Sequence, residues 1–446
     1  MESMNEPEPA TAGKETVETE VGSVFVSNYP PFSSWGPQHV PAIADALSRP
    51  AARETDFGLY MHIPFCRKRC KFCYFRVYTD KNFDEIGSYL DALATEIETC
   101  ATMPAIAGRK PKFVYFGGGT PSYISVKHLK ALVDRVQAAI PWDGVEEVSF
   151  ECEPGTLTES KVHALREVGV TRLSLGIENF DDEILRENGR AHETKEIGRC
   201  LPWIEAAGFD QLNIDLIAGM VGERWATWRE TVARTIDLMP SSVTVYQMEL
   251  PFNTRFSARV LDGSLEVPLA DWDTKRAWQD YAYNELAKVG YEVSSAYTMV
   301  RSLEATRFVY RDSVWAGCDL LGTGVASFSH VGGVHFQNID GWGEYLATAR
   351  DGRLPHSRAF PTSDHDRLIR QLILQLKRGY LDAADFQSKF GVDIRTQFGS
   401  QFDALAERGM LEKSEDAIRL TRQGLLQVDT LLPSFYDAAY HGARYT

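Results

Sequence analysis

The sequence lacks several features that mark membrane proteins and nucleic-acid-binding proteins. It has no run of about 18 apolar residues, so no transmembrane helix is expected. Its 47 Lys and Arg residues are outnumbered by 62 Asp and Glu residues, and the formal charge of −15 argues against a nucleic acid or an anionic membrane as a partner. The N-terminus is acidic, the opposite of a signal or transit peptide. We therefore expect a cytoplasmic, monomeric protein with a small-molecule substrate.

Cysteine is also scarce, with seven residues in the whole chain. Their odd number and the lack of an export signal argue against a disulfide framework. Cys66, Cys70 and Cys73 share one loop, with the spacing C-x3-C-x2-C. Three thiolates can hold a four-iron, four-sulfur cluster and leave one iron free to bind a small molecule, whereas a cluster held by four cysteines mostly transfers electrons.

Two other interpretations of these cysteines stay open at this stage. A structural zinc site needs four ligands, usually in two separated pairs, so His62 or a distant residue would have to supply the fourth. Three unconnected buried thiols would leave their clustering in a single loop unexplained. The spacing favours an iron–sulfur cluster over zinc.

Strand and helix patterns alternate from residue 57 to about residue 250. Short apolar runs predict buried parallel strands at 58–63, 112–116, 147–152, 172–178, 211–217 and 242–249. Helical patterns lie between them at 83–101, 125–139, 158–168, 193–207 and 224–238, and a further helix is expected at 273–289. The alternation predicts an α/β fold with an open partial (β/α)6 barrel over residues 57–270, and a doubly wound sheet is the second choice.

The regions around this barrel differ in composition. Residues 1–22 are polar and acidic and predict a disordered tail, whereas 23–56 should form an extended segment rich in aromatic residues and proline. Residues 271–360 are expected to extend the barrel with mixed strands and a glycine-rich pocket. Residues 361–446 predict a small helical domain like a winged helix, because a hairpin pattern at 411–420 follows a helix. This segment is not basic, so a packing role is favoured over DNA binding.

Residues that can bind a ligand follow the predicted strands. The cysteine loop follows the first strand, Gly117-Gly-Gly-Thr-Pro121 follows the second, and Glu151-Cys-Glu153 follows the third. Active sites of β/α barrels lie at the C-terminal strand ends, so these motifs should meet at one edge. A run of three glycines lets the backbone approach a ligand closely and directs its N–H groups at a carboxylate or phosphate.

Charged residues complete this edge of the predicted barrel. The carboxylate of Glu151 could accept hydrogen bonds from both hydroxyl groups of a ribose. Asp215 lies inside an apolar run, where a buried carboxylate is costly unless it is paired. Arg190, beyond the fourth strand, could bind a ligand carboxylate with two hydrogen bonds. Helix capping, a salt bridge or a surface position is the alternative for each of these residues.

Together these motifs resemble the oxygen-independent coproporphyrinogen III oxidase-like family of the radical S-adenosylmethionine (SAM) superfamily. The resemblance runs from about residue 24 to the C-terminus. It rests on Tyr60-x-His-Ile-Pro-Phe-Cys66, Phe116-Gly-Gly-Gly-Thr-Pro121, Arg172-Leu-Ser-Leu-Gly176, Asn213-Ile-Asp-Leu-Ile-x-Gly219 and Leu320-Leu-Gly-x-Gly-Val325. The family includes oxidases, haem chaperones and related methyltransferases and cyclopropanases.

The resemblance also implies cofactors and residue roles. It implies a [4Fe-4S] cluster, SAM as one molecule or two, and an electron donor such as flavodoxin or ferredoxin. The implied cluster ligands are Cys66, Cys70 and Cys73, and Tyr60 would be a catalytic residue beside the cluster. The implied residues of the first SAM site are Phe72, Gly117, Gly118, Gly119, Thr120, Glu151, Arg190 and Asp215. Gly322 and Gly324 would line a second pocket for SAM or substrate.

Three departures from the family pattern bear on the reaction. Phe75 occupies the position of a fourth cysteine in the oxidases, and Glu178 replaces a glutamine at the SAM site. Arg311 and Asp312 stand where the haem chaperones have a His-Asn pair. We therefore expect a radical SAM enzyme that uses two SAM molecules to transfer a methyl or methylene group to an unsaturated or aromatic substrate. The alternatives are oxidative decarboxylation of coproporphyrinogen III in porphyrin biosynthesis and a non-catalytic haem chaperone.

Overall fold

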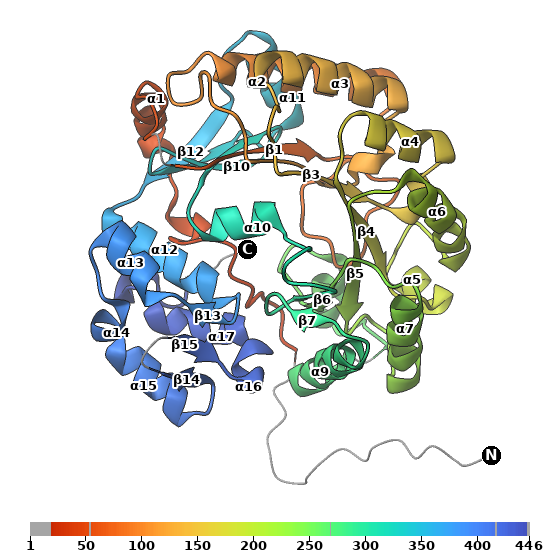
Figure 1. Ribbon diagram of the computed structural model, residues 1–446. Coiled ribbons are helices and arrows are strands. Elements are labelled where there is room, and N and C mark those ends of the chain that lie inside the picture. Colours follow the sequence, from red (N-terminus) through yellow and green to blue (C-terminus); the bar gives the residue numbers. More distant parts are fainter. Residues whose placement is uncertain (1–18, 53–54, 268, 415–416, 444–446) are drawn as a thin grey trace, which may run out of the picture.

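A twelve-stranded sheet forms the centre of the computed structural model, which describes residues 19–52, 55–267, 269–414 and 417–443 (Figure 1). Its first six strands are β1 (Phe57–Ile63), β2 (Phe113–Gly118), β3 (Glu147–Cys152), β4 (Arg172–Glu178), β5 (Gln211–Ala218) and β6 (Ser242–Gln247). They lie side by side in sequence order and pair in parallel. This arrangement confirms the predicted α/β fold and brings the carboxyl ends of these strands to one edge of the sheet.

Later strands extend both sides of this parallel core. They are β7 (Glu292–Val293), β8 (Thr298–Val300), β9 (Asp319–Thr323), β10 (Phe328–Val331), β11 (Val334–Asn338) and β12 (His356–Pro361). β9 pairs in parallel with β1, β10 to β12 continue the sheet antiparallel, and β8 pairs antiparallel with β6. In the described residues the sheet runs from β12 to β7 and these two outer strands do not pair, so the barrel is open.

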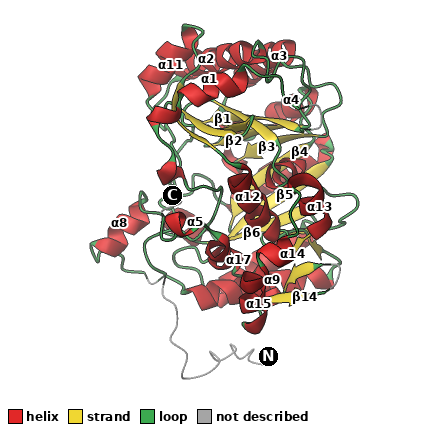
Figure 2. Ribbon diagram, turned by 90° about the vertical axis from the view of Figure 1, so that its left-hand side faces the viewer, coloured by secondary structure: helices red, strands yellow, loops and turns green. Residues whose placement is uncertain are grey.

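Helices cover the outer face of the sheet (Figures 1 and 2). The connecting helices are α2 (Phe83–Ala101), α3 (Val126–Ala139), α4 (Glu159–Glu167), α5 (Asp182–Glu187), α6 (Thr194–Ala207) and α7 (Trp225–Asp237). They are followed by α8 (Arg255–Leu261), α9 (Trp272–Lys288), α10 (Val309–Trp315) and α11 (Trp342–Arg350). Each long connecting helix buries one apolar stripe against the strands. None of the described helices has both the length and the hydropathy to span a bilayer.

The C-terminal residues form a separate layer of short elements beside the sheet, blue in Figure 1. The helices are α12 (Asp364–Leu376), α13 (Ala383–Phe390), α14 (Ile394–Gln397), α15 (Gly399–Glu407), α16 (Arg422–Leu425) and α17 (Val428–Leu431). The strands are β13 (Tyr380–Leu381), β14 (Leu411–Lys413) and β15 (Ile418–Leu420), which form a small sheet in the order β13-β15-β14. The hairpin of β14 and β15 follows α15, as the sequence pattern predicts.

The structure corrects the expectation for residues 23–56. This region is not extended throughout, because it contains the helix α1 (Pro41–Leu47), which begins at a proline where the missing N–H needs no partner. Its aromatic part packs as expected, since Val26, Tyr29 and Trp35 are buried. The short helices α5 and α8 were also not expected. Residues 1–18 of the predicted acidic tail lie outside the described residues.

A buried carboxylate ties α2 to the later strands. Glu96 on α2 accepts hydrogen bonds from the backbone N–H of Gly324 at 3.0 Å, from Asn338 Nδ2 at 2.6 Å and from the Tyr345 hydroxyl at 2.6 Å. Its side chain is buried, and burial raises the pKa of Glu96 to about 7 despite the three donors. The turn after β9 is thus fixed by a group that titrates near neutrality.

This carboxylate makes the stability depend on pH. The pKa of Glu96 is higher in the folded protein than its usual value of 4.5, so the folded state binds an extra proton between these pH values. Stability should therefore fall as the pH rises from 4.5 to 7, by about 3 kcal/mol for this group. Urea unfolding at the two ends of this range should show that Glu96→Gln removes this part of the pH dependence.

A second variant separates this effect from other buried carboxyl groups. Tyr345→Phe removes one donor to Glu96, so the pKa of Glu96 should rise and the loss of stability should extend to higher pH. An identical pH profile for the wild type and both variants would contradict the assignment.

Candidate functional site

A cavity of about 600 Å³ lies at the carboxyl ends of the parallel strands. Cys66, Cys70 and Cys73 form part of its wall, and the ends of β3, β4 and β5 form another part. Its volume is in the range of small-molecule binding sites. The cysteine loop, the glycine run and the carboxylates predicted from the sequence therefore meet at one site.

The cysteine loop is held in place by hydrogen bonds to its backbone and its sulfur atoms. The N–H of Cys66 donates to the carbonyl of Tyr78 at 3.1 Å, and the Thr120 hydroxyl donates to Cys66 Sγ at 3.3 Å. All three cysteines are free thiols and partly exposed to the cavity. Burial raises the pKa of Cys66 to about 12 and that of Cys73 to about 11, which favours the protonated thiols. A metal that binds these thiols would displace their protons and hold them as thiolates.

The ligands that the loop offers fit a four-iron cluster with one open iron. The three thiolates of such a cluster each bind a different iron. A structural zinc site instead needs four ligands around one ion.

Glu151, at the end of β3, connects the glycine run to the cavity. It accepts hydrogen bonds from the Tyr115 hydroxyl at 2.7 Å and from the N–H of Gly118 at 3.1 Å. Gly118 has a positive φ of 115°, and a Cβ at Gly119 would lie 2.9 Å from the backbone of Phe65, so both positions require glycine. Burial raises the pKa of Glu151 to about 7.

Arg190 lies at the centre of this wall. It donates to the carbonyl of Gly176 at 2.7 Å and to Cys70 Sγ at 3.5 Å, and it lies 3.5 Å from Glu178 Oε1. Glu178 has a φ of 66°, unusual for a residue with a side chain, where a bulge interrupts the pairing of β4 with β5. Burial raises the pKa of Glu178 to about 7, although the positive charge of Arg190 acts in the opposite direction.

Asp215 on β5 adds a third carboxylate to the same wall. It accepts hydrogen bonds from the Ser174 hydroxyl at 2.7 Å and from Asn213 Nδ2 at 2.9 Å, and burial raises its pKa. Three buried carboxylates therefore face one arginine across the cavity wall. Such a wall suits a ligand that carries positive charge and several hydroxyl groups.

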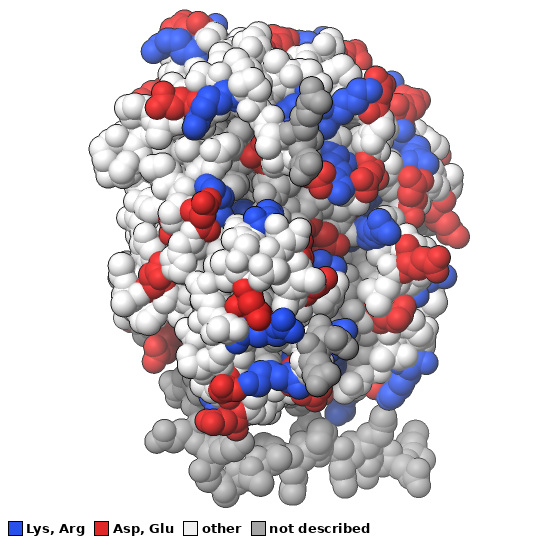
Figure 3. Space-filling model, turned by 60° about the vertical axis from the view of Figure 1, so that its left-hand side comes forward, with Lys and Arg blue, Asp and Glu red and all other residues white. Residues whose placement is uncertain are grey.

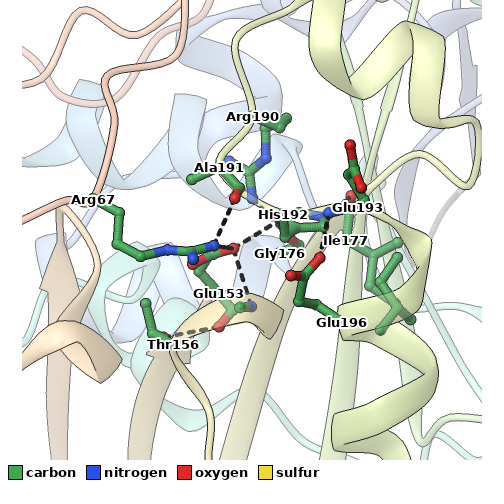
Figure 4. Close-up of polar contacts among 12 residues, drawn as sticks. Arg67, Glu153, Thr156, Gly176, Ile177, Arg190, Ala191, His192, Glu193 and Glu196 are labelled. Atoms are coloured by element: carbon green, nitrogen blue, oxygen red, sulfur yellow. Dashed lines mark hydrogen bonds and ion pairs between the residues drawn. The ribbon is translucent and has the colours of Figure 1, made fainter.

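A fourth carboxylate, Glu153, has a structural role beside the cavity (Figure 4). Its Oε1 accepts from Arg67 Nη2 at 3.1 Å and lies 3.1 Å from Nδ1 of His192. Burial would raise the pKa of Glu153, but the His192 hydrogen bond and the positive charges of Arg190 and Arg67 outweigh it and lower the pKa to about 2. Glu153 thus anchors the cysteine loop through Arg67 and remains ionised.

Most of the residues expected to bind the cofactor line this cavity. They are Phe72, Gly118, Gly119, Thr120, Glu151, Arg190 and Asp215. Gly117 is not part of the lining. It packs closely on the Tyr115 ring, which a Cβ at this position would meet at 2.7 Å. Tyr60 is not part of it either. Its ring stacks on Tyr115 at 5.8 Å and its hydroxyl lies 3.2 Å from His62 Nδ1, so it supports the wall rather than facing the ligand.

Gly322 and Gly324, which were expected to line a second pocket, are closely packed in the structure. A Cβ at Gly322 would lie 2.1 Å from the carbonyl oxygen of Phe328, and one at Gly324 would lie 2.5 Å from the Tyr89 hydroxyl. Neither glycine lines the 600 Å³ cavity. Both positions require glycine for close packing around β9, and a second ligand site there stays a prediction.

Aromatic residues that sequence reasoning did not single out form an aromatic wall of the cavity. Tyr115, Tyr246, Tyr297, Phe308 and Tyr310 line the cavity, and the rings of Tyr115 and Tyr310 lie 4.2 Å apart. They come from β2, β6, the turn before β8 and the start of α10, with no common motif or spacing. Only the fold brings them together.

Both ends of the chain also close over the cavity. Val24 and Phe25 line it and donate their N–H groups to Glu249 Oε1 at 3.0 and 2.9 Å. From the C-terminal layer, Asp429 binds Lys377 Nζ at 2.8 Å and also accepts a hydrogen bond from the Tyr297 hydroxyl. Sequence patterns did not identify these contacts, because they join residues that lie between 52 and 225 positions apart.

Comparisons with known proteins agree with this site. Residues 60–234 match the Radical SAM superfamily, and residues 362–426 match the HemN C-terminal domain. An oxygen-independent coproporphyrinogen III oxidase from Synechocystis sp. is 26% identical, covering 92% of this chain and 91% of its own length. The heme chaperone HemW from Bacillus subtilis is 25% identical, covering 84% of this chain and 98% of its own length.

A solved structure supports the fold. The structure of coproporphyrinogen III oxidase from Escherichia coli matches with a TM-score of 0.80 and 24% identity, covering 92% of this chain and 96% of that chain. Residues 60–234 are thus a radical SAM domain, and residues 362–426 are a HemN C-terminal domain. The homologues of the chain are oxygen-independent coproporphyrinogen III oxidases and the heme chaperone HemW. Its cofactors are a [4Fe-4S] cluster and SAM, and the three free thiols of the cysteine loop fit the cluster.

The closure of the cavity can be tested at Asp429. Asp429→Asn would leave the buried ammonium group of Lys377 without its carboxylate, which should lower the free energy of unfolding by about 3 kcal/mol. Urea unfolding measures this loss. In the control Asp210→Asn, the partner Arg166 lies at the surface, so the loss should be below about 1 kcal/mol. Equal losses in the two variants would show that the buried pair does not hold the closing segment.

The role of Arg190 in the wall can be tested by substitution. Arg190→Lys keeps a positive charge, but a single ammonium group cannot reach Gly176, Glu178 and Cys70 together. We expect SAM binding to the reconstituted protein to weaken by about tenfold or more, as measured by equilibrium dialysis without oxygen. The exposed Arg199→Lys is the control. Wild-type SAM affinity in Arg190→Lys would contradict this role.

Proposed function

We propose that this chain is a radical SAM enzyme that removes a hydrogen atom from a propionate side chain of a porphyrinogen. The resulting substrate radical would lose CO₂ and pass one electron to an external one-electron acceptor, which completes the oxidative decarboxylation and leaves a vinyl group. SAM would bind between the cysteine loop and the carboxylate wall, and the porphyrinogen would bind against the aromatic wall. The relatives of the same length support this assignment, since several are named coproporphyrinogen III oxidases. The bound cluster and SAM supply the 5′-deoxyadenosyl radical, and the protein orients both molecules and excludes water.

In this proposal, different residues of the wall bind different parts of SAM. The glycine backbone at Gly118 and Gly119 faces the amino acid part, and Glu151 accepts hydrogen bonds from the ribose hydroxyls. Arg190 and Asp215 complete the site, and the ring of Phe72 packs on the adenine. The raised pKa of Glu151 matters here, because hydrogen bonds from the ribose favour its charged form.

The observation that carries the choice of substrate is a buried, unpaired donor in the cavity. Arg276 lines the cavity, and its Nε is buried without a hydrogen-bond partner among the described residues. Burial lowers the pKa of Arg276, although Asp273 lies 3.4 Å from Nη1. Lys68 on the cysteine loop also lines the cavity and is exposed. Propionate carboxylates would satisfy both cations.

A second candidate is transfer of a methyl or methylene group from a second SAM molecule to an unsaturated or aromatic substrate. It is favoured by Phe75, which stands where the oxidases have a fourth cysteine and lines the cavity with its ring 4.4 Å from that of Tyr74. The packing of Gly322 and Gly324 removes one of its supports. Porphyrinogen decarboxylation therefore has the stronger support.

One experiment distinguishes the candidates. The protein is reconstituted with iron and sulfide without oxygen, reduced with dithionite and incubated with SAM and coproporphyrinogen III. Formation of 5′-deoxyadenosine with release of CO₂ supports the proposal. S-Adenosylhomocysteine as a product would replace it with methyl or methylene transfer. Stoichiometric haem binding without SAM cleavage would indicate a chaperone.

The role of Arg276 predicts a selective defect. Arg276→Gln should raise KM for coproporphyrinogen by about tenfold or more, since a hydrogen bond to a charged group is lost, and should leave SAM binding unchanged. Arg229→Gln, on α7 outside the cavity lining, is the control. An unchanged KM would show that Arg276 does not bind the substrate.

A further inference from the structure

A second cavity of about 830 Å³ lies at the other end of the sheet. Its wall includes Asp56, Lys112 and Glu146, which directly precede β1, β2 and β3, so it faces the amino ends of the strands. The other side of the cavity is formed by α10 and by the small sheet of the C-terminal layer. Leu425 is the one residue that lines both cavities, so the two sites are otherwise distinct.

The charge of this cavity is opposite to that of the chain. The chain carries a formal charge of −15, and the face in Figure 3 shows acidic and basic side chains interspersed. In contrast, six cationic side chains and three anionic ones line the cavity, a net charge of +3. The cationic residues are Lys112, Arg307, Arg311, Arg378, Arg419 and Arg422.

The acidic residues of the cavity are already paired. Asp56 lies 2.8 Å and Glu146 lies 3.9 Å from Lys112 Nζ, and Asp312 lies 2.7 Å from Arg311 Nη2. Arg422 is paired with Asp280, outside the cavity lining, at 2.7 Å. For Arg307, Arg378 and Arg419, the described residues supply no carboxylate within 4.0 Å. Within the described part of the chain, these three guanidinium groups thus lack a counter-charge.

Two of these arginines contact the same aromatic ring. Tyr380 on β13 lies directly opposite Arg419 on β15 in the strand register. The guanidinium groups of Arg378 and Arg419 lie 4.9 and 5.4 Å from the centre of the Tyr380 ring, and Arg378 Nη2 donates to its hydroxyl at 2.6 Å. Two like charges on one ring repel each other, and an anion between them would remove this cost.

A buried arginine provides a further unused donor. Arg311 is 7% exposed, and its Nη2 donates to the Ser294 hydroxyl at 2.9 Å. Its Nη1 is buried and has no hydrogen-bond partner among the described residues. A guanidinium group presents its donors as a planar fork that matches the oxygens of a phosphate or carboxylate. The cavity therefore contains a fixed donor without an acceptor in the protein.

We propose that this cavity binds a small molecule with two or more anionic oxygen groups, of the phosphate ester or carboxylate class. One group would lie between Arg378 and Arg419, and the other near Arg307 and Arg311. The site would join the barrel to the C-terminal layer, because its cations come from both. This proposal does not depend on the reaction at the cluster.

The proposal is tested with the full-length, cluster-reconstituted protein by isothermal titration calorimetry without oxygen. Fructose bisphosphate probes phosphate esters and tricarballylate probes carboxylates, so a preference between them identifies the class of ligand. Binding of either probe should raise the thermal midpoint with increasing concentration, since ligands of the native state stabilise it. Binding should weaken as salt is added.

Matched variants locate the binding. The double variant Arg378→Gln/Arg419→Gln should bind the better probe at least about tenfold more weakly, and Arg307→Gln should weaken it to a smaller extent. Arg307 and Arg419 are exposed, so their replacement should not prevent folding. Arg408→Gln, an exposed arginine of the same layer outside the cavity, is the control. Failure of both probes to bind, or equal binding to wild type and double variant, would overturn the proposal.

Discussion

A single buried guanidinium group, Arg190, holds together the wall on which the site depends. It contacts the carbonyl of Gly176, the sulfur of Cys70 and the carboxylate of Glu178, and so connects the cysteine loop to the end of β4. Without this charge, three buried carboxylates would repel one another at the same strand ends, and the neutral forms would be favoured further. Arg190 therefore links the position of the cysteine loop to the charge balance of the wall.

The cavities at the two ends of the sheet differ in the arrangement of their charged residues. At the carboxyl ends, three carboxylates lie around Arg190, whereas at the amino ends guanidinium groups surround carboxylates that already have partners. The C-terminal layer contributes to both, through Asp429 at the first cavity and Arg419 at the second. A layer whose sequence suggests a packing module thus lines the cavities at both ends of the barrel.

The sequence predicts the parallel core and the cysteine loop because both depend on local patterns. The apolar runs give β1 to β6 with ends within two residues, and the C-x3-C-x2-C spacing identifies the loop directly. The pairing of β9 with β1 depends on contacts across about 260 residues and leaves no local signal. A glycine required for packing and one required by a ligand look alike in a sequence, so the pattern at Gly322 and Gly324 does not distinguish the two roles. The aromatic wall was missed because its rings come from β2, β6, the turn before β8 and the start of α10.

The closing of the first cavity by both ends of the chain has a consequence for its assembly. The six parallel strands and the cysteine loop lie within about the first 250 residues, whereas Asp429 and its neighbours are synthesised much later. The cover that Asp429 and Lys377 fix in place can therefore form only after the cysteine loop has been synthesised. The order of synthesis thus makes this cover a late step in the formation of the first cavity.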